Sequence, residues 1–477
     1  MNAKKIAAFA VGPIGGAVLG FVTLPIITWF YSAEDIGRIS MLQVTSSFCI
    51  LLFSLGLDQA YVRDYHESVH RPALLKTAVL PGLLLITMTL ALFLIVPGFI
   101  SETLFSVDSV LISALVALCF LSGFVSRFLS LVLRMQERGL AFSMSQVLPK
   151  LIFLSAVGIY ALFSFGFDLI HLIMAQTLSI LAVTLIYGWN TRREWLSARK
   201  QRIDIEQLKA MLRFGAPLIM GGVAFWGLTA MDRIFLRNLS TFEELGIYSV
   251  ASSFAAAAVI LQSIFSTVWV PTVYKWAAEG INTDKIDQVT EYVLIAVVAL
   301  FSLAGLCSWL VVYLLPSTYA NVQYILVACM AYPLLYTLSE ATGVGLGIAR
   351  KSTYAMMASI IAVAVNFFGN YLLIPTFGAA GAAIATALAF WVFFFVRTEL
   401  ANRVWRRRPR VKLYGMTLIC LAASVLFVLS GKEHSFTFIF LWLAILCVPL
   451  LSVFSGTGRQ KISIKNFFNK KSMERSK

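Results

Sequence analysis

The side chains best suited to chemistry are the few charged ones that lie inside long apolar runs. Lys150 lies within one such run, and Arg127 lies late in the run before it. A charged group inside a membrane-spanning helix costs about 2.5–3.5 kcal/mol or more, so such positions are functional candidates by default. Both groups are cations that could bind an anionic substrate. The alternative for each is snorkelling, in which the cation reaches the headgroups at the nearer membrane surface.

Other polar residues inside or beside the apolar runs are weaker candidates. Arg233 and Asn366 could also line a substrate cavity, and Glu340 could take up a coupling proton or cation. The alternatives are a structural ion pair for Arg233 and Glu340, and a hydrogen bond between helices for Asn366. The candidates for coupling or gating are Glu340, Asp232, Asp58 and Arg63. Asp58 and Arg63 flank the inner end of a predicted span, where a capping or gate salt bridge is the alternative.

Patterns typical of a cofactor-dependent enzyme do not occur in the sequence. The four histidines, at 66, 70, 171 and 434, have no metal-ligand spacing, and no phosphate-binding G-x-x-x-x-G-K-[ST] motif is found. The six cysteines lie in apolar runs, which indicates buried small hydrophobes instead of a disulfide framework. We therefore expect a transporter with no metal and no cofactor, whose energy source would be a proton or sodium gradient.

The elements that must position these residues are membrane-spanning helices. The chain is 59% hydrophobic and 13% charged, with a mean hydropathy of +0.85. Apolar runs of about 18–25 residues recur along it, each long enough to cross a membrane. The fold class expected is all-α polytopic, with about fourteen transmembrane helices. The predicted spans are 6–30, 40–60, 74–99, 109–133, 144–163, 169–190, 214–237, 247–273, 288–315, 321–347, 354–374, 380–402, 413–430 and 436–454.

The charge pattern orients these spans. With the N-terminus inside, most of the 38 lysines and arginines fall in the inside segments, which predicts cytoplasmic N- and C-termini. The net charge of +15 then reflects topology and attraction to anionic lipid headgroups, so no nucleic-acid partner is expected. The longest inside loop, 191–213, is either an amphipathic helix on the membrane surface or a solvated linker.

A weak internal repeat divides the chain. Glu34, Gly37 and Ser40 recur as Glu243, Gly246 and Ser249, and further matches include Arg138 with Arg350, Gly166 with Gly378 and Asn190 with Asn402. The offset covers six spans, an even number, so the halves are parallel repeats around an axis near the membrane normal. The predicted parts are an N-lobe (1–192), a linker (193–213), a C-lobe (214–403), and a last helix pair with a basic tail (404–477). Lys150 falls opposite Ala362, so a cationic site should be weighted toward the N-lobe.

Three stretches resemble one known superfamily. They are NFFGNYLLIPTFGAAGAAIAT (366–386), LGLDQAYVRDYHE (55–67) and MDRIFLRNLSTFEELGIYSVA (231–251), and they are similar to the MOP superfamily of exporters, especially its polysaccharide branch with the Wzx-type flippases. The last helix pair departs from the twelve-helix plan of that branch. It resembles the fourteen-helix layout of lipid II flippases and of some polysaccharide exporters.

The resemblance implies two facing bundles, arranged in a V, around a central cavity. It implies a flippase that moves an undecaprenyl-pyrophosphate-linked oligosaccharide from the inner to the outer leaflet of a bacterial cytoplasmic membrane by alternating access. The product would be O-antigen, in lipopolysaccharide, or capsule, and the partners would be the lipid-linked glycan, membrane lipids and polysaccharide polymerase or chain-length machinery. The alternatives are a lipid II-type flippase, a multidrug or cation antiporter of the MATE type, a membrane glycan polymerase or ligase, and a structural scaffold. The antiporter branch usually carries a carboxylate in its first helix, whereas 6–30 carries no charge here.

Overall fold

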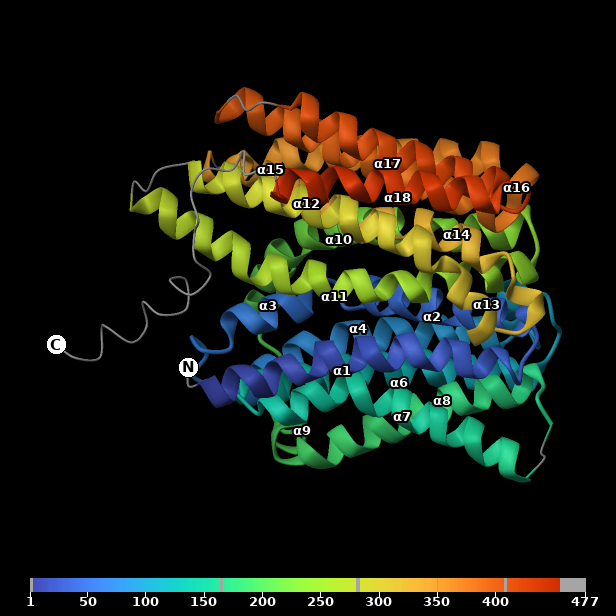
Figure 1. The fold of residues 1–477 in the computed structure, drawn as a ribbon. Coiled ribbons are helices and arrows are strands. Elements are labelled where there is room, and N and C mark those ends of the chain that lie inside the picture. Colours follow the sequence, from blue (N-terminus) through green and yellow to red (C-terminus); the bar gives the residue numbers. More distant parts are fainter. Residues whose placement is uncertain (1–2, 164–165, 280–283, 350, 407–409, 455–477) are drawn as a thin grey trace.

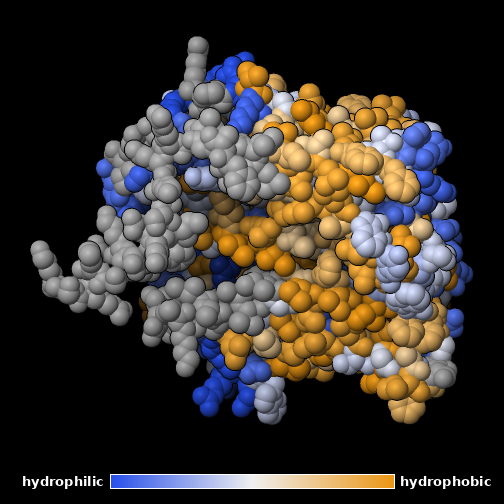
Figure 2. Space-filling view, viewed as in Figure 1, coloured by the Kyte–Doolittle hydropathy of each residue, from blue (hydrophilic) through white to orange (hydrophobic). Residues whose placement is uncertain are grey.

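The described part of the chain is a bundle of long helices that run roughly parallel to one another (Figure 1). The computed structural model describes residues 3–163, 166–279, 284–349, 351–406 and 410–454, and these contain no strand. Apolar side chains cover the middle of the outer surface, and hydrophilic ones gather toward its two ends (Figure 2). The first lobe contains α1 (Ala3–Thr28), α2 (Ala33–Phe53), α3 (Leu57–Asp64), α4 (Arg71–Leu94), α5 (Phe99–Phe105), α6 (Val110–Met135), α7 (Gly139–Phe163) and α8 (Leu169–Asn190).

The remaining helices form the linker, the second lobe and an outer pair. They are α9 (Arg192–Arg199), α10 (Ile205–Leu239), α11 (Phe242–Ala278), α12 (Asp284–Cys307), α13 (Val311–Leu314), α14 (Val322–Cys329), α15 (Ala331–Ile348), α16 (Ser352–Val404), α17 (Val411–Ser430) and α18 (Ser435–Phe454), with short 3-10 turns at Ser308–Leu310 and Ser317–Tyr319. Figure 1 shows α1 to α8 on one side of the molecule and α10 to α16 on the other. The pair α17 and α18 packs on the C-lobe, where Trp391 Nε1 donates a 3.2 Å hydrogen bond to Thr417 Oγ1.

The prediction of an all-helical membrane protein is confirmed. Eleven of the described helices are long and apolar enough to span a membrane, and two shorter apolar segments, Gly15–Thr28 and Ser435–Pro449, accompany them. The count of about fourteen stays a prediction. One end of the bundle carries the start of α1, α3 and α9, and we call it the basic end; the other carries α5, α13 and the start of α2, and we call it the acidic end (Figure 1).

The helix α16 contains two predicted spans. Its 53 residues would extend about 80 Å if straight, but Gly378 (φ +52°) folds it back on itself. The backbone nitrogen of Ala379, which starts the second arm, donates a 2.7 Å hydrogen bond to the carboxylate of Glu244 from α11. A negative group at a helix N-terminus is stabilising. Gly166, matched to Gly378 by the repeat, also has a positive φ (+89°), so both lobes turn at the same point.

The predicted linker, 193–213, is divided in the structure. Its first part forms the short helix α9, and Asp204 then caps α10 by accepting hydrogen bonds from the backbone nitrogens of Glu206 and Gln207. Ile205, at the start of the apolar face of the predicted linker helix, is therefore the first residue of the long helix α10. The basic tail, 455–477, and Arg350 lie outside the described residues.

Candidate substrate cavity

Lys150 is placed by a row of glycines on α1. The helix α7 packs so closely on this row that a side chain would not fit. A Cβ added at Gly12 would lie 2.7 Å from the Cα of Ser143, and one added at Gly16 would lie 3.1 Å from the Cβ of Gln146. The close approach brings the Lys150 ammonium to α1, where it donates a hydrogen bond to the carbonyl oxygen of Gly16. The helix α7 continues through Pro149. Small residues at i and i+4 permit such packing between membrane helices.

Lys150 and Arg127 line one cavity. Its volume is about 540 Å³, and its walls come from six helices: α1, α2, α6, α7, α8 and α11. The polar lining residues are Thr23, Gln43, Ser126, Arg127, Ser130, Ser145, Lys150, Gln176 and Ser253. A second cavity of about 560 Å³ adjoins it and shares Ile50 and Arg127. The cavity thus combines two cations with amides and hydroxyls, and of its six helices only α11 belongs to the C-lobe.

The partner of Arg127 is Asp58. Their side chains form a 2.7 Å salt bridge, and Asp58 is only 6% exposed. This salt bridge is possible because the helix is interrupted between α2 and α3. Leu55 and Gly56 have positive φ (+53° and +67°), so α2 ends before them and α3 starts in a new direction, with its first residues toward α6. A salt bridge between Asp58 and Arg63 does not occur, because Arg63 lies further along α3 and pairs with Asp64 (2.6 Å).

Arg63 lies at the contact between the lobes, at the basic end. Its guanidinium stacks over the ring of Phe214 on α10, 3.9 Å from the ring centre. The hydrogen bond to Asp64 raises the pKa of Arg63, so this group keeps its charge. Beside it, a Cβ at Gly56 would lie 2.4 Å from the carbonyl oxygen of Gly215. The lobes therefore touch backbone to backbone along α3 and α10.

Asp232 is the centre of a buried polar cluster in the C-lobe. It is 1% exposed, and its carboxylate accepts hydrogen bonds from Asn366 (3.1 Å), Asn370 (2.7 Å), Thr386 (2.6 Å) and Tyr248. Among the described residues no lysine, arginine or histidine nitrogen lies within 4 Å of it. Asn366 thus bonds between helices and does not line either of the two cavities beside Arg127.

Arg233 points away from the carboxylate beside it in sequence. It donates a 3.4 Å hydrogen bond to the carbonyl of Thr229, and its guanidinium lies over the ring of Tyr248 at 5.7 Å. Arg233 and Asp232 together line a small cavity of about 120 Å³. This cavity is too small for a glycan, and it shares only Ala256 with the cavity that holds Lys150.

Glu340 ties α15 to α11. Its carboxylate accepts a hydrogen bond from Ser266, and its backbone carbonyl accepts one from Trp269 Nε1 (3.2 Å). Arg397, a charged residue that sequence reasoning missed, lies nearby on α16: it donates to Ser339 Oγ (3.1 Å), and its guanidinium is 5.6 Å from the Phe393 ring. The signal was present, because Arg397 lies inside the predicted span 380–402.

The acidic end is closed by residues that the repeat matches to one another. The helices α2 and α11 cross there in close contact. If Gly37 carried a Cβ, that atom would lie 2.0 Å from the carbonyl oxygen of Phe242, and a Cβ at Gly246 would lie 2.0 Å from the carbonyl oxygen of Ala33. One turn deeper, Ser249 Oγ donates to Ser40 Oγ at 2.7 Å. The residues that the repeat matches, Gly37 with Gly246 and Ser40 with Ser249, therefore form a pseudo-twofold contact between the lobes.

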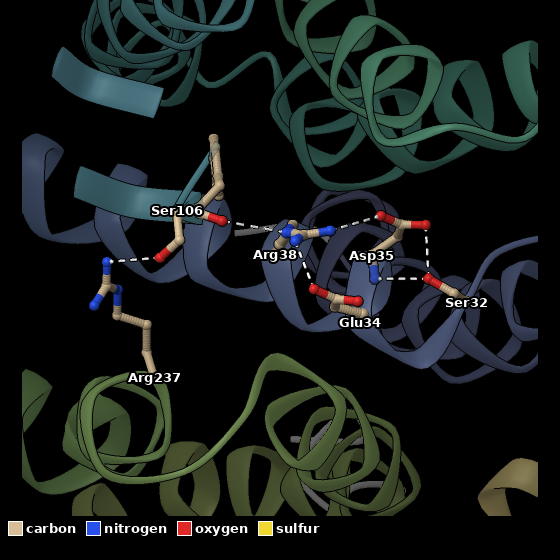
Figure 3. Close-up of polar contacts among 7 residues, drawn as sticks. Ser32, Glu34, Asp35, Arg38, Ser106 and Arg237 are labelled. Atoms are coloured by element: carbon tan, nitrogen blue, oxygen red, sulfur yellow. Dashed lines mark hydrogen bonds and ion pairs between the residues drawn. The ribbon is translucent and has the colours of Figure 1, made fainter. Parts of the chain in front are cut away.

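Charged residues surround this crossing (Figure 3). Arg38 pairs with Glu34 (2.5 Å) and Asp35 (3.3 Å) on its own helix, and its guanidinium lies 5.2 Å from the ring of Phe242 in the other lobe. Arg237, from the C-lobe, donates to Ser106 Oγ (3.5 Å) and to the carbonyl of Thr103 beside it in the N-lobe (2.6 Å). Toward the basic end a recess is visible in the surface, with both hydrophobic and hydrophilic residues inside it (Figure 2).

Comparisons with known proteins agree with this architecture. The family of polysaccharide biosynthesis proteins matches residues 3–276. A probable low-salt glycan biosynthesis flippase, Agl15 of Haloferax volcanii, is 23% identical over 240 residues, which are 49% of this chain and 50% of that one. The chain therefore aligns with about half the length of this curated relative.

Two solved structures share the fold. The lipid II flippase MurJ in an inward closed conformation has a TM-score of 0.68 at 14% identity, and the match covers 94% of this chain and 98% of MurJ. An inward-facing multidrug resistance MATE transporter of the MOP superfamily has a TM-score of 0.55 at 14% identity, covering 83% and 95%. With the family model matching more than half of the sequence, this chain belongs to the polysaccharide biosynthesis protein family, and it has the fold of the MOP superfamily transporters.

Proposed function

We propose that this protein is a flippase that moves a lipid-linked oligosaccharide with a pyrophosphate linkage across a membrane. The observation that carries the proposal is the cavity walled by five N-lobe helices and α11, in which Lys150 and Arg127 face the same space as amides and hydroxyls. Two cations suit a pyrophosphate, and the uncharged polar groups suit sugar hydroxyls. The relative from Haloferax volcanii is named as a glycan flippase, which supports the same substrate class.

The charge pattern supports an orientation of the protein in the membrane. We assign the basic end to the cytoplasm, because lysine and arginine are enriched on that side of membrane proteins. The acidic end is closed at Gly37 and Gly246, and the lobes also touch at Gly56 and Gly215 at the basic end. We therefore assign the structure to the inward side of the transport cycle, before the basic end opens fully to the inner leaflet. Closure at the basic end and opening at the acidic end would complete the alternating-access cycle.

The finer assignment is an undecaprenyl-pyrophosphate-linked unit of O-antigen or capsule, delivered to the outer leaflet of a bacterial cytoplasmic membrane. A polysaccharide polymerase would then use it. A lipid II-type flippase is the second candidate, favoured by the similarity of the whole fold to MurJ. Both candidates share the lipid pyrophosphate, so they predict the same role for the two cations.

The test is deletion of the gene followed by measurement of lipid-linked glycan in each leaflet. A lectin that cannot cross the membrane reports the outer leaflet in right-side-out vesicles and the inner leaflet in inverted ones. Complete lipid-linked units should accumulate on the inner leaflet. Accumulation of single units on the outer leaflet would contradict flipping and would indicate a polymerase or a ligase.

We propose further that Asp232 carries the coupling ion, a proton or Na⁺. A buried carboxylate with only neutral partners is costly unless a cation joins it. A nearby oxygen is also available, because Asn370 Oδ1 is buried without a hydrogen-bond partner among the described residues. Glu340 is less suited to this role, since its contacts tie α15 to α11.

Asp232→Asn is expected to lower gradient-driven transport at least tenfold. The amide keeps the shape of the side chain but removes the charge that would hold the ion. Transport into proteoliposomes should be measured under a proton gradient and, separately, under a Na⁺ gradient. Only one gradient should drive the wild type, and the variant should respond to neither. Glu340→Gln is the matched control and should keep most of the response; full gradient-driven transport by Asp232→Asn would refute the assignment.

A further inference from the structure

We propose that a groove on the outer face of the N-lobe binds one anionic glycerophospholipid, with its phosphate at the basic end. The groove has a volume of about 850 Å³ and lies between α4, α6, α8 and α9. Its length is lined by apolar side chains such as Leu83, Phe128 and Leu185. Three basic residues, Lys76, Arg192 and Arg199, are also among its lining residues, at the end of the groove formed with α9.

The groove is separate from the cavity that holds Lys150. The helix α6 lies between them: it contributes Val125 and Phe128 to the groove, and Arg127 and Ser130 to the cavity. A ligand in the groove therefore lies in the lipid phase and does not occupy the proposed path of the glycan.

Lys76 joins the groove to the linker between the lobes. Its ammonium donates hydrogen bonds to the backbone carbonyls of Arg199 (3.0 Å) and Gln201 (2.7 Å), at the C-terminus of α9. An ammonium has three N–H groups, so one is left for a phosphate oxygen. A cation at a helix C-terminus is itself stabilising, and Lys76 thus also holds α9 against α4.

Arg192 is held in place at the same end of the groove. Its guanidinium lies over the Trp189 ring, 4.4 Å from the ring centre, and one of its N–H groups donates to the Trp189 carbonyl (2.9 Å). A second indole, that of Trp195, also lines the groove, and its Nε1 donates a hydrogen bond to the carbonyl of Gly188 (2.8 Å). Tryptophans gather at headgroup depth in membrane proteins, which puts these cations at the level of lipid phosphates.

These features select one class of occupant. Apolar walls accept acyl chains, and basic pockets between helices at the cytoplasmic surface bind anionic headgroups. A zwitterionic lipid offers no net charge to the three cations. The occupant is therefore an anionic phospholipid, represented by phosphatidylglycerol, with its phosphate shared by Lys76, Arg192 and Arg199.

Binding should be measured on the full-length protein by native mass spectrometry, with added dioleoyl phosphatidylglycerol or dioleoyl phosphatidylcholine. We expect phosphatidylglycerol to be retained preferentially. Arg192→Gln/Arg199→Gln should weaken its binding about 30-fold, at roughly fivefold for each cation near the surface. Lys76 is left intact in this variant, because its contacts with α9 make it structural as well.

A second variant fills the groove without a change in charge. No described atom lies within 4 Å of a Cβ built at Gly188, so Gly188→Phe can place its ring among the groove residues and should also displace the lipid. Gly158→Phe is the matched control, since Gly158 has the same open space but does not line the groove. Lys209→Gln/Lys275→Gln controls for charge, because both lysines form exposed pairs away from the groove.

Two outcomes would show that the groove does not bind an anionic lipid specifically. One is equal retention of phosphatidylglycerol and phosphatidylcholine by the wild type. The other is an equal loss of phosphatidylglycerol from the Lys209→Gln/Lys275→Gln variant, which would indicate general attraction to a basic surface. Retention by Lys150→Ala is expected and supports the groove over the central cavity as the site, whereas loss of the lipid from Lys150→Ala would assign it to that cavity.

Discussion

Lys150→Ala is expected to reduce transport of lipid-linked glycan roughly ten- to hundredfold, while the protein still reaches the membrane. A hydrogen bond to a charged group contributes about 1.5–3 kcal/mol, which corresponds to that range. In the structure the ammonium rests on the Gly16 carbonyl at the wall of the cavity. A pyrophosphate that enters the cavity would exchange this neutral partner for an anionic one. Surface glycan and the inner-leaflet pool of lipid-linked units are the measurements.

Two further variants separate binding from structure. Lys150→Arg keeps the cation and should retain part of the activity. Gly20→Ala leaves Lys150 in place but puts a methyl group 2.6 Å from its Nζ. Because that atom is the end of a flexible side chain, the ammonium should move while the helices stay packed, so transport falls and the melting temperature does not. The control is Lys209→Ala, which removes an exposed cation at the basic end and should have no effect. Normal glycan display by Lys150→Ala at low expression would contradict the assignment.

Ser40→Cys/Ser249→Cys is expected to stop transport when oxidised and to restore it when reduced. The two hydroxyl oxygens are 2.7 Å apart across the lobe contact, close to the roughly 2.0 Å of a disulfide bond. A disulfide there would fix α2 to α11 and keep the acidic end closed. If the protein works by alternating access, the locked state can load substrate but cannot release it. Transport should be followed in proteoliposomes before and after addition of a reductant.

The controls for the disulfide are the two single variants and the background. The variants belong in a chain whose six native cysteines have been replaced, because two of them, Cys307 and Cys447, are exposed and could react with the introduced thiols. Ser40→Cys and Ser249→Cys alone should transport equally with and without oxidant. Full transport by the oxidised double variant, with the disulfide verified by mass spectrometry, would show that the acidic end need not open.

The glycines at the crossing explain why the internal repeat is detectable at all. Gly37 and Gly246 each face a carbonyl of the opposite helix, so neither position has room for a side chain. Arg138 and Asn190, also matched by the repeat, hydrogen-bond to each other within the N-lobe at 3.2 Å. Their C-lobe counterparts include Arg350, which lies outside the described residues. The repeat thus marks contacts that hold the frame, whereas Lys150, opposite Ala362, belongs to one lobe alone.

The sequence by itself determined the all-helical membrane class and the resemblance to the superfamily whose fold the chain has. These properties depend on hydropathy, charge and spacing along the chain, all of which are local. Lys150 and Arg127 could also be chosen from the sequence, because a charge inside an apolar run is conspicuous wherever it points. Arg397 met the same criterion and was missed.

Only the tertiary structure decided which charges share a space. Asp58 pairs with Arg127 across 69 residues because Leu55 and Gly56 turn α3 toward α6. Three of the four donors to Asp232 lie 134 to 154 residues away, and the fourth, Tyr248, lies on the next helix, so the sequence around Asp232 does not identify it as the centre of a cluster. The direction in which a helix faces is set by the helices packed against it, and the sequence of one helix does not contain that information.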